Sequence, residues 1–143
     1  LSHYMFEHWM RRVYHPDTGK GLLAILRDAE AAHAVTRLWD EVARLFLKKV
    51  RRWPDGRMAA PVDQTTTSPV RATFGKDVLQ LSLGAQKDYW LKQTLSGREV
   101  PPRALEGDEA VLDFVAAQQG AIAYVSEGTP LPPTVRALKV VAP

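Results

Sequence analysis

The chain has 143 residues, of which 45% are hydrophobic and 24% are charged, and its formal net charge is +3. This length is sufficient for one domain with a buried core, and the composition is that of a globular protein. The positive charge is compatible with an anionic ligand but is too small to indicate nucleic-acid binding by itself. The absence of cysteine excludes disulfides and thiolate metal sites.

The first 14 residues carry apolar side chains at helical spacing, which predicts an amphipathic helix with Ser2 as its N-cap. Charged residues and histidines interrupt this segment, so no signal peptide is visible. Three interpretations stay open: a helix docked on the core, a helix that binds a partner or a membrane surface, and a poorly ordered leader. We therefore divide the chain into an N-terminal helix or leader, residues 1–20, and an α/β domain, residues 21–143.

No apolar run in the sequence reaches the roughly 18 residues that a transmembrane helix needs.

The domain begins with residues 22–26, a short apolar run that predicts a buried strand. A helix is the alternative there, because residues 22–34 are rich in helix-forming alanine, leucine and glutamate. Thr36 is the predicted N-cap of the next helix, which has apolar side chains from Leu38 to Phe46 on one face.

A basic run ends this predicted helix. Its members are Arg44, Lys48, Lys49, Arg51, Arg52 and Arg57. Nucleic-acid binding would require such charge together with aromatic side chains that stack on bases, and only Trp53 lies beside the run. Cations near a helix C-terminus also stabilise the helix. The run is therefore interpreted as a solvated face, and no specific nucleic-acid partner is expected.

The rest of the chain alternates between apolar segments and turn signals. After a turn at residues 53–56, we predict a strand at 58–62 and a helix from Pro69 to about residue 81, with Gly84 closing this part of the chain. A helix at 86–96, stopped by Gly97, and a loop at Pro101 and Pro102 follow. The last predicted elements are a helix capped by Asp108 and ended by Gly120, a strand at 121–125, a turn at 128–133 and a strand at 135–141. This order of strands and helices favours a single layered α/β domain.

The strongest candidate for a binding site is the hydroxyl-rich loop of Thr65, Thr66, Thr67 and Ser68, which opens onto a predicted helix. A helix N-terminus exposes unpaired backbone N–H groups and favours anions. Arg71 would lie one turn into that helix, where its guanidinium could bind an oxyanion. The alternative interpretation is that Ser68 caps the helix and the threonines fill a turn.

Catalytic and metal-binding patterns are weak by comparison. The four histidines share no metal-ligand spacing, and neither serine flanked by leucine, Ser82 or Ser96, lies in a nucleophile elbow. We therefore expect no catalytic residue, no metal, no cofactor and no enzymatic activity.

The run LFLKKVRRWPDGRMAAPVD, residues 45–63, resembles a segment of the phosphate-binding proteins of ABC transporters, and in particular of their short single-domain relatives. Further landmarks of that family follow in the same order. They are Ser68-Pro69-Val70-Arg71, Tyr89-Trp90, Phe114-Val115 and the segment GAIAYV at residues 120–125. The resemblance covers residues 38–125.

This resemblance implies the type 2 periplasmic binding-protein fold, as a single three-layer α/β/α lobe. It implies a non-enzymatic protein of the periplasm that binds phosphate or another small oxyanion and serves a membrane transporter or another protein partner. In full-length members phosphate lies between two lobes, held partly by a hydroxyl loop at a helix start, the place that Thr65 to Ser68 occupy here. Weakened or lost ligand binding is compatible with the resemblance. The alternative function is a protein-interaction module that uses the N-terminal helix or the surface of the lobe.

Overall fold

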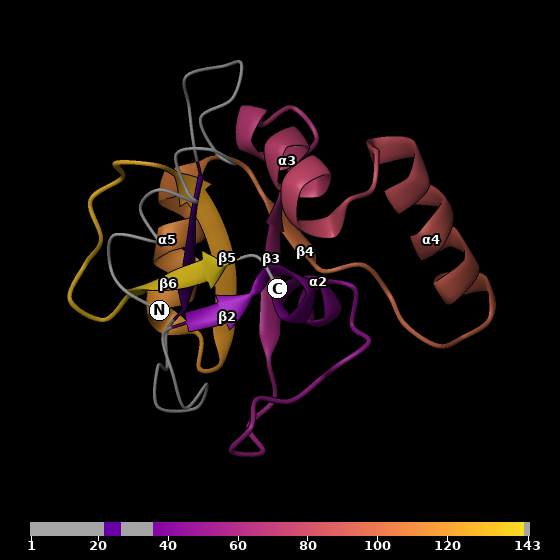
Figure 1. Ribbon diagram of the computed structural model, residues 1–143, viewed down its shortest axis with the longest axis horizontal. Coiled ribbons are helices and arrows are strands. Elements are labelled where there is room, and N and C mark those ends of the chain that lie inside the picture. Colours follow the sequence, from indigo (N-terminus) through magenta and orange to yellow (C-terminus); the bar gives the residue numbers. More distant parts are fainter. Residues whose placement is uncertain (1–21, 27–35, 142–143) are drawn as a thin grey trace.

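The computed structural model describes residues 22–26 and 36–141, and the predicted helix of residues 1–14 lies outside them. The described elements form one mixed sheet with helices on both faces (Figure 1). Their bounds are β1 Leu22–Leu26, β2 Thr36–Leu38, α2 Trp39–Phe46, β3 Ala60–Gln64, α3 Pro69–Phe74, the π-helix η1 Gly75–Leu79, α4 Leu83–Leu95, β4 Arg103–Leu105, α5 Asp108–Ala117, β5 Ala121–Ser126 and β6 Arg136–Val141.

The six strands of the sheet follow the order β2-β6-β1-β5-β3-β4. Strand β1 is antiparallel to both β5 and β6, whereas β3 runs parallel to β4 and β5. The carboxyl ends of β3, β4 and β5 therefore meet at one edge of the sheet. In open α/β sheets this is the edge at which ligands bind.

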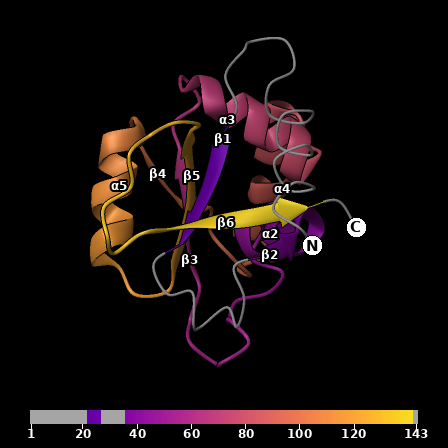
Figure 2. The ribbon, with the colours of Figure 1, turned by 60° about the vertical axis from the view of Figure 1, so that its left-hand side comes forward.

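Helices cover the two faces of the sheet unequally, as Figure 2 shows: α5 lies on one side of the strands and α2, α3 and α4 lie on the other. Side chains of β5 alternate between the two layers, as the pleat of a strand requires. Ile122 and Tyr124 pack with the α2–α3 layer, whereas Ala121, Ala123 and Val125 pack with the α5 layer. The predicted three-layer α/β/α lobe is confirmed.

The centre of the α2–α3 layer is aromatic. The rings of Phe74 and Tyr124 stack with their centroids 4.0 Å apart, and Phe46 packs at 4.6 Å from Phe74. All three side chains are almost fully buried. This cluster fixes the face of β5 that carries Tyr124, which matters for the site described below.

The strand predicted at residues 22–26 is confirmed as β1, and the alternative helix is excluded for these five residues. The prediction of Thr36 as a helix N-cap is wrong, because Thr36–Leu38 forms β2 and pairs with β6. No element was predicted at residues 103–105, where the short strand β4 pairs in parallel with β3. In both cases pairing with a distant strand outweighs the local signal.

Helix α2 ends earlier than the basic run suggested, at Phe46. Lys48 donates its backbone N–H to the carbonyl of Leu45, and Lys49 donates to that of Arg44. These two bonds form a Schellman motif with Lys48 at the left-handed position, φ 58°. Glycine is the usual residue there, because a side chain at positive φ is sterically strained.

The predicted turn at residues 53–56 is confirmed by a hydrogen bond from the Gly56 N–H to the Trp53 carbonyl. The Trp53 side chain is buried, and its Nε1 donates to the carbonyl of Gly120 at 2.8 Å. The strand that follows begins two residues later than predicted, at Ala60, and extends to Gln64.

The segment after Pro69 is less regular than one continuous helix. Pro69 is in the first helical turn, as predicted, but α3 passes into the π-helix η1 after Phe74. Gly84 does not close this section, because α4 begins at Leu83 with Ser82 as its N-cap. Gly97 adopts φ 70° directly after α4, which confirms the predicted stop.

The last helix and strands follow the predicted order. Asp108 is not the N-cap of α5 but its first residue, because Gly107 occupies the cap position. The Asp108 carboxylate instead accepts hydrogen bonds from Gln64 Nε2 and from the backbone N–H of Ser126, both at 3.1 Å. It therefore joins the ends of β3 and β5. The predicted strands β5 and β6 are confirmed to within one residue at each end.

Candidate functional site

The hydroxyl-rich loop lies directly after the carboxyl end of β3. The backbone N–H of Thr65 donates to the carbonyl of Leu105 at 3.1 Å, which ties the loop to the end of β4. The Ser68 N–H donates to the Thr65 carbonyl at 2.9 Å and closes a turn. The hydroxyls of Thr65 and Thr67 lie 3.2 Å apart, and Thr66 and Thr67 are exposed.

Ser68 holds the N-cap position of α3, but its hydroxyl makes no cap hydrogen bond. It donates to Oε1 of Gln64 at 2.6 Å instead. Gln64 is 1% exposed, and its amide group also donates to the backbone carbonyl of Tyr124 at 2.9 Å. Ser68 thus belongs to a buried network that joins β3, β5 and α3.

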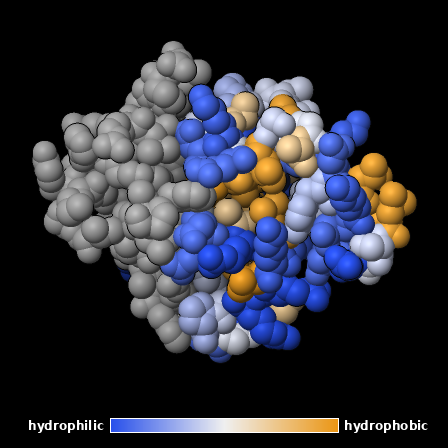
Figure 3. All heavy atoms as spheres, turned by 45° about the vertical axis from the view of Figure 1, so that its right-hand side comes forward, coloured by the Kyte–Doolittle hydropathy of each residue, from blue (hydrophilic) through white to orange (hydrophobic). Residues whose placement is uncertain are grey.

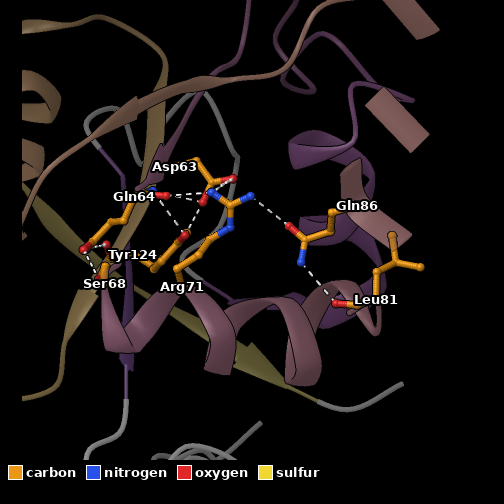
Figure 4. A network of polar contacts seen from close by, with 7 residues as sticks. All are labelled: Asp63, Gln64, Ser68, Arg71, Leu81, Gln86 and Tyr124. Atoms are coloured by element: carbon orange, nitrogen blue, oxygen red, sulfur yellow. Dashed lines mark hydrogen bonds and ion pairs between the residues drawn. The ribbon is translucent and has the colours of Figure 1, made fainter. Parts of the chain in front are cut away.

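Arg71 points back toward the sheet and not into solvent, as Figure 4 shows. Its Nη1 donates to the backbone carbonyl of Gln64 at 2.6 Å and lies 3.3 Å from Oδ2 of Asp63. Its Nη2 donates to Oε1 of Gln86 on α4 at 3.1 Å. Only 12% of the Arg71 side chain is exposed, and its guanidinium joins α3 to both β3 and α4.

Asp63 is the acidic partner of this arginine and is itself buried. Its Oδ1 accepts hydrogen bonds from the Tyr124 hydroxyl and from the backbone N–H of Gln64. Burial raises the pKa of Asp63, while the Tyr124 hydrogen bond and the Arg71 charge oppose that shift. Burial and the neighbouring carboxylate also raise the pKa of Tyr124, so its hydroxyl remains a donor.

A hollow of about 490 Å³ opens beside this network. We call it the Arg71 hollow. Its lining residues come from the end of β3, from α3 and α4, and from the segment leading into β4; those that carry polar or charged groups are Asp63, Thr66, Arg71, Gln86 and Lys87. Apolar walls are supplied by Trp90, Pro101, Pro102 and others. A hollow of this kind, apolar with a few convergent polar groups, is typical of small-ligand sites.

The structure brings only some of the predicted site residues to this hollow. Thr66 and Arg71 line it, whereas Thr65, Thr67 and Ser68 lie in the same loop but not in the lining. The residues that sequence reasoning missed are Asp63, Gln86 and Lys87. Lys87 is exposed, and no acidic side chain in residues 22–26 and 36–141 is paired with it.

The face of the molecule that Figure 3 shows carries apolar patches among hydrophilic ones, and several exposed leucines belong to α4. Leu83 both lines the hollow and is 40% exposed. Leu91 and Leu95 lie further along α4 and are 55% and 78% exposed. The outer rim of the hollow is therefore partly apolar.

Other kinds of site find no support among the described residues. No group of three or more histidine, aspartate or glutamate side chains in residues 22–26 and 36–141 is arranged to hold a metal ion. Within the same residues, no helix has the length and apolar character that crossing a bilayer requires.

Neither a protein-family model nor a curated protein sequence matches this chain. Solved structures do match it. A Clostridium perfringens protein described as a phosphate ABC transporter substrate-binding protein, with phosphate bound, superposes with a TM-score of 0.64 at 15% identity, over 85% of this chain and 45% of its own. An ABC-type phosphate transport receptor from Vibrio cholerae gives 0.62 at 15% identity, over 85% and 46%. The PstS protein of Borrelia burgdorferi gives 0.61 at 11% identity, over 85% and 47%.

The fold is therefore that of one lobe of a phosphate ABC transporter substrate-binding protein, as the sequence resemblance implied. The chain spans less than half the length of each of these three proteins. Identity of 11–15% shows the fold and does not by itself transfer a ligand.

Proposed function

We propose that this lobe is a non-enzymatic binding domain for a small oxyanion of the phosphate class, and that the Arg71 hollow is its binding site. The observation that carries the proposal is the position of this hollow. It lies at the carboxyl ends of parallel strands, beside Thr66 and Arg71, in a fold shared with a phosphate-bound structure. Five ligand residues were proposed from the sequence: Thr65, Thr66, Thr67, Ser68 and Arg71. Thr66 and Arg71 would contact the ligand directly, and the other three would hold the loop and the start of the helix in place.

The charges at the site support weak binding and not tight capture. Arg71 is compensated by Asp63 at 3.3 Å, so its charge is largely cancelled before a ligand arrives. Lys87 supplies the remaining positive charge of the lining. Its side chain is exposed, and an ion pair at an exposed position adds little to the free energy of binding. Thr66 also lines the hollow and adds a hydroxyl that can donate a hydrogen bond. A dissociation constant in the millimolar range is expected.

The role that goes with such a site is ligand binding on behalf of a transporter or another protein, outside the cytoplasmic membrane. Two of the structural neighbours, which are described as phosphate ABC transport proteins, support this role. A protein-interaction function of the lobe surface is the second candidate, and a separate observation favours it in the next subsection.

Thermal unfolding in phosphate tests the proposal. A millimolar dissociation constant predicts about 1.8 kcal/mol of stabilisation at about 20 mM phosphate, or a rise in Tm of about 5 °C, relative to chloride at equal ionic strength. Lys87→Ala should reduce this rise, whereas Lys92→Ala, also an exposed lysine of α4 but outside the hollow, should not. Equal melting temperatures in phosphate and chloride would contradict the proposal.

A further inference from the structure

A second hollow lies on the other side of the segment that leads into β4. We call it the Arg103 hollow. It has a volume of about 240 Å³, and its walls come from the end of α2, the segment before β3, β3 itself, the segment 99–103 and α5. Pro102 borders both hollows, whereas Arg103 faces this one and Ala104 faces the Arg71 hollow. The alternation of side chains along β4 separates the two.

The charged residues of its lining are three cations and one acid: Lys48, Arg51, Arg103 and Glu99. Glu99 is paired with Arg51 at 2.9 Å. Lys48 and Arg103 have no acidic partner among the described residues, so the lining carries two positive charges in excess. The guanidinium of Arg103 lies over the ring of Phe114, 5.2 Å from its centroid. This contact holds the cation in place without neutralising it.

The lining of the Arg103 hollow also contains exposed apolar side chains. Val50 is 42% exposed and Met58 is 50% exposed, and both line the hollow. Methionine is a common contact residue at binding surfaces, because its flexible side chain adapts to different partners. Exposed apolar side chains beside uncompensated cations fit a ligand that is acidic and apolar at once.

The backbone at Lys48 adds an independent observation. The residue has φ 58°, a conformation that costs free energy for any side chain and that glycine would adopt without cost. The Schellman motif at the end of α2 sets this geometry, and strained residues of this kind are also found at functional sites. Here the strained position carries one of the two unpaired cations of the hollow.

We propose that the Arg103 hollow docks a segment of a partner protein that presents acidic side chains next to apolar ones. Charge complementarity with Lys48 and Arg103 would orient the segment, and Val50 and Met58 would contact its apolar side chains. Nucleic acid is disfavoured because the nearby rings cannot stack on bases. Trp53 is 3% exposed, and Phe114 is covered by Arg103.

A peptide titration of the full chain tests this proposal. The probe is a synthetic peptide of alternating leucine and glutamate, compared with leucine–glutamine and serine–glutamate peptides of equal length. The leucine–glutamate peptide should bind best, with amide shifts in NMR spectra centred on residues 48–51, 58–60 and 103. Its affinity should fall with salt, because Arg103 is exposed and Lys48 is partly exposed, so both charges are screened.

Variants separate docking from general attraction between charges. Arg103→Glu should weaken the leucine–glutamate peptide about tenfold, because reversal removes one attraction and adds one repulsion. Met58→Ser should weaken it as well, while Lys92→Glu, an equal charge change on α4 outside the hollow, should leave it unchanged. Equal effects of Arg103→Glu and Lys92→Glu would overturn the proposal. So would tighter binding of a single-stranded DNA oligomer or of anionic phospholipid vesicles than of the peptide.

Discussion

The Arg71 and Arg103 hollows share Pro102 but differ in how their charges are arranged. In the first, the main cation is buried and paired: Arg71 contacts Asp63, Gln64 and Gln86. In the second, Arg103 is exposed and Lys48 is half-buried, and neither has an acidic partner among the described residues. A paired cation holds the ends of strands and helices together, whereas an unpaired one can attract a partner. Mutation of the paired Arg71 should therefore act mainly on stability, whereas mutation of the unpaired Arg103 should act mainly on binding.

The largest effect is expected for Arg71→Met. The substitution leaves the Asp63 carboxylate buried without its cation, which should lower the free energy of unfolding by about 3 kcal/mol. Urea denaturation measures this loss, and Arg98→Met, at an exposed site outside both hollows, is the matched control. Addition of Asp63→Asn to Arg71→Met should recover part of the loss. A loss equal to that of the control would contradict the structural role of the pair.

A smaller effect is expected from pH. Burial raises the pKa of Asp63 above 3.8, so the folded protein binds this proton more readily than the unfolded chain. The group therefore adds stability at pH values below its raised pKa, and this contribution is lost as pH rises through that pKa. Unfolding of the wild type and of Asp63→Asn should be compared from neutral pH to about pH 4. The difference should shift in favour of the wild type as pH falls, and a shift the other way would indicate a lowered pKa.

Lys48→Gly should stabilise the protein by about 1 kcal/mol, because it relieves the strain at φ 58°. Thermal unfolding provides the measurement, with Lys49→Gly as the neighbouring control. The same variant should bind the leucine–glutamate peptide more weakly, since one cation of the Arg103 hollow is gone. A variant that is more stable and binds less well would show that the Lys48 side chain serves binding and not stability. Unchanged or lower stability would argue against strain at Lys48.

The smallest effect is expected for Arg51→Ala. Its ion pair with Glu99 is 2.9 Å long, but 63% of the arginine side chain is exposed. Exposed pairs contribute about 0–1 kcal/mol and are screened by salt, so the free energy of unfolding should change by well under 1 kcal/mol. Urea denaturation at low and high salt would detect a larger contribution of this ion pair to stability. A loss of unfolding free energy comparable to that of Arg71→Met would contradict the expected difference between the exposed and the buried arginine.

Local signals in the sequence predicted much of the fold. Pro69 after Ser68 and Gly97 after α4 act through backbone preferences, and the apolar run 22–26 acts through its need for burial. These signals can be read without knowledge of the rest of the chain. Strands β2 and β4 were not predicted, because each has three residues and exists through pairing with β6 or β3. The passage from α3 into a π-helix also had no sequence signal that we could identify.

The site was harder to predict than the fold. The loop at Thr65 to Ser68 could be located from its hydroxyls and the following proline, but the orientation of Arg71 could not. That orientation depends on Gln86, 15 residues further along the chain, and on Tyr124, which contacts Asp63 across 61 residues. Such contacts follow from the packing of α4 and β5 against β3. The same packing brings Lys87 to the hollow, although nothing in its own sequence neighbourhood indicates a ligand.

Phosphate binding at the Arg71 hollow is the central claim, and an NMR titration of the full chain with inorganic phosphate tests it most directly. We expect saturable shifts with a millimolar dissociation constant at the amides of Thr66, Lys87 and Ala104, and weaker binding by Lys87→Ala. Chloride at equal ionic strength should not reproduce these shifts. Shifts that do not saturate by about 50 mM phosphate, well above the concentration that a millimolar site requires, would contradict the claim. So would shifts confined to the Arg103 hollow.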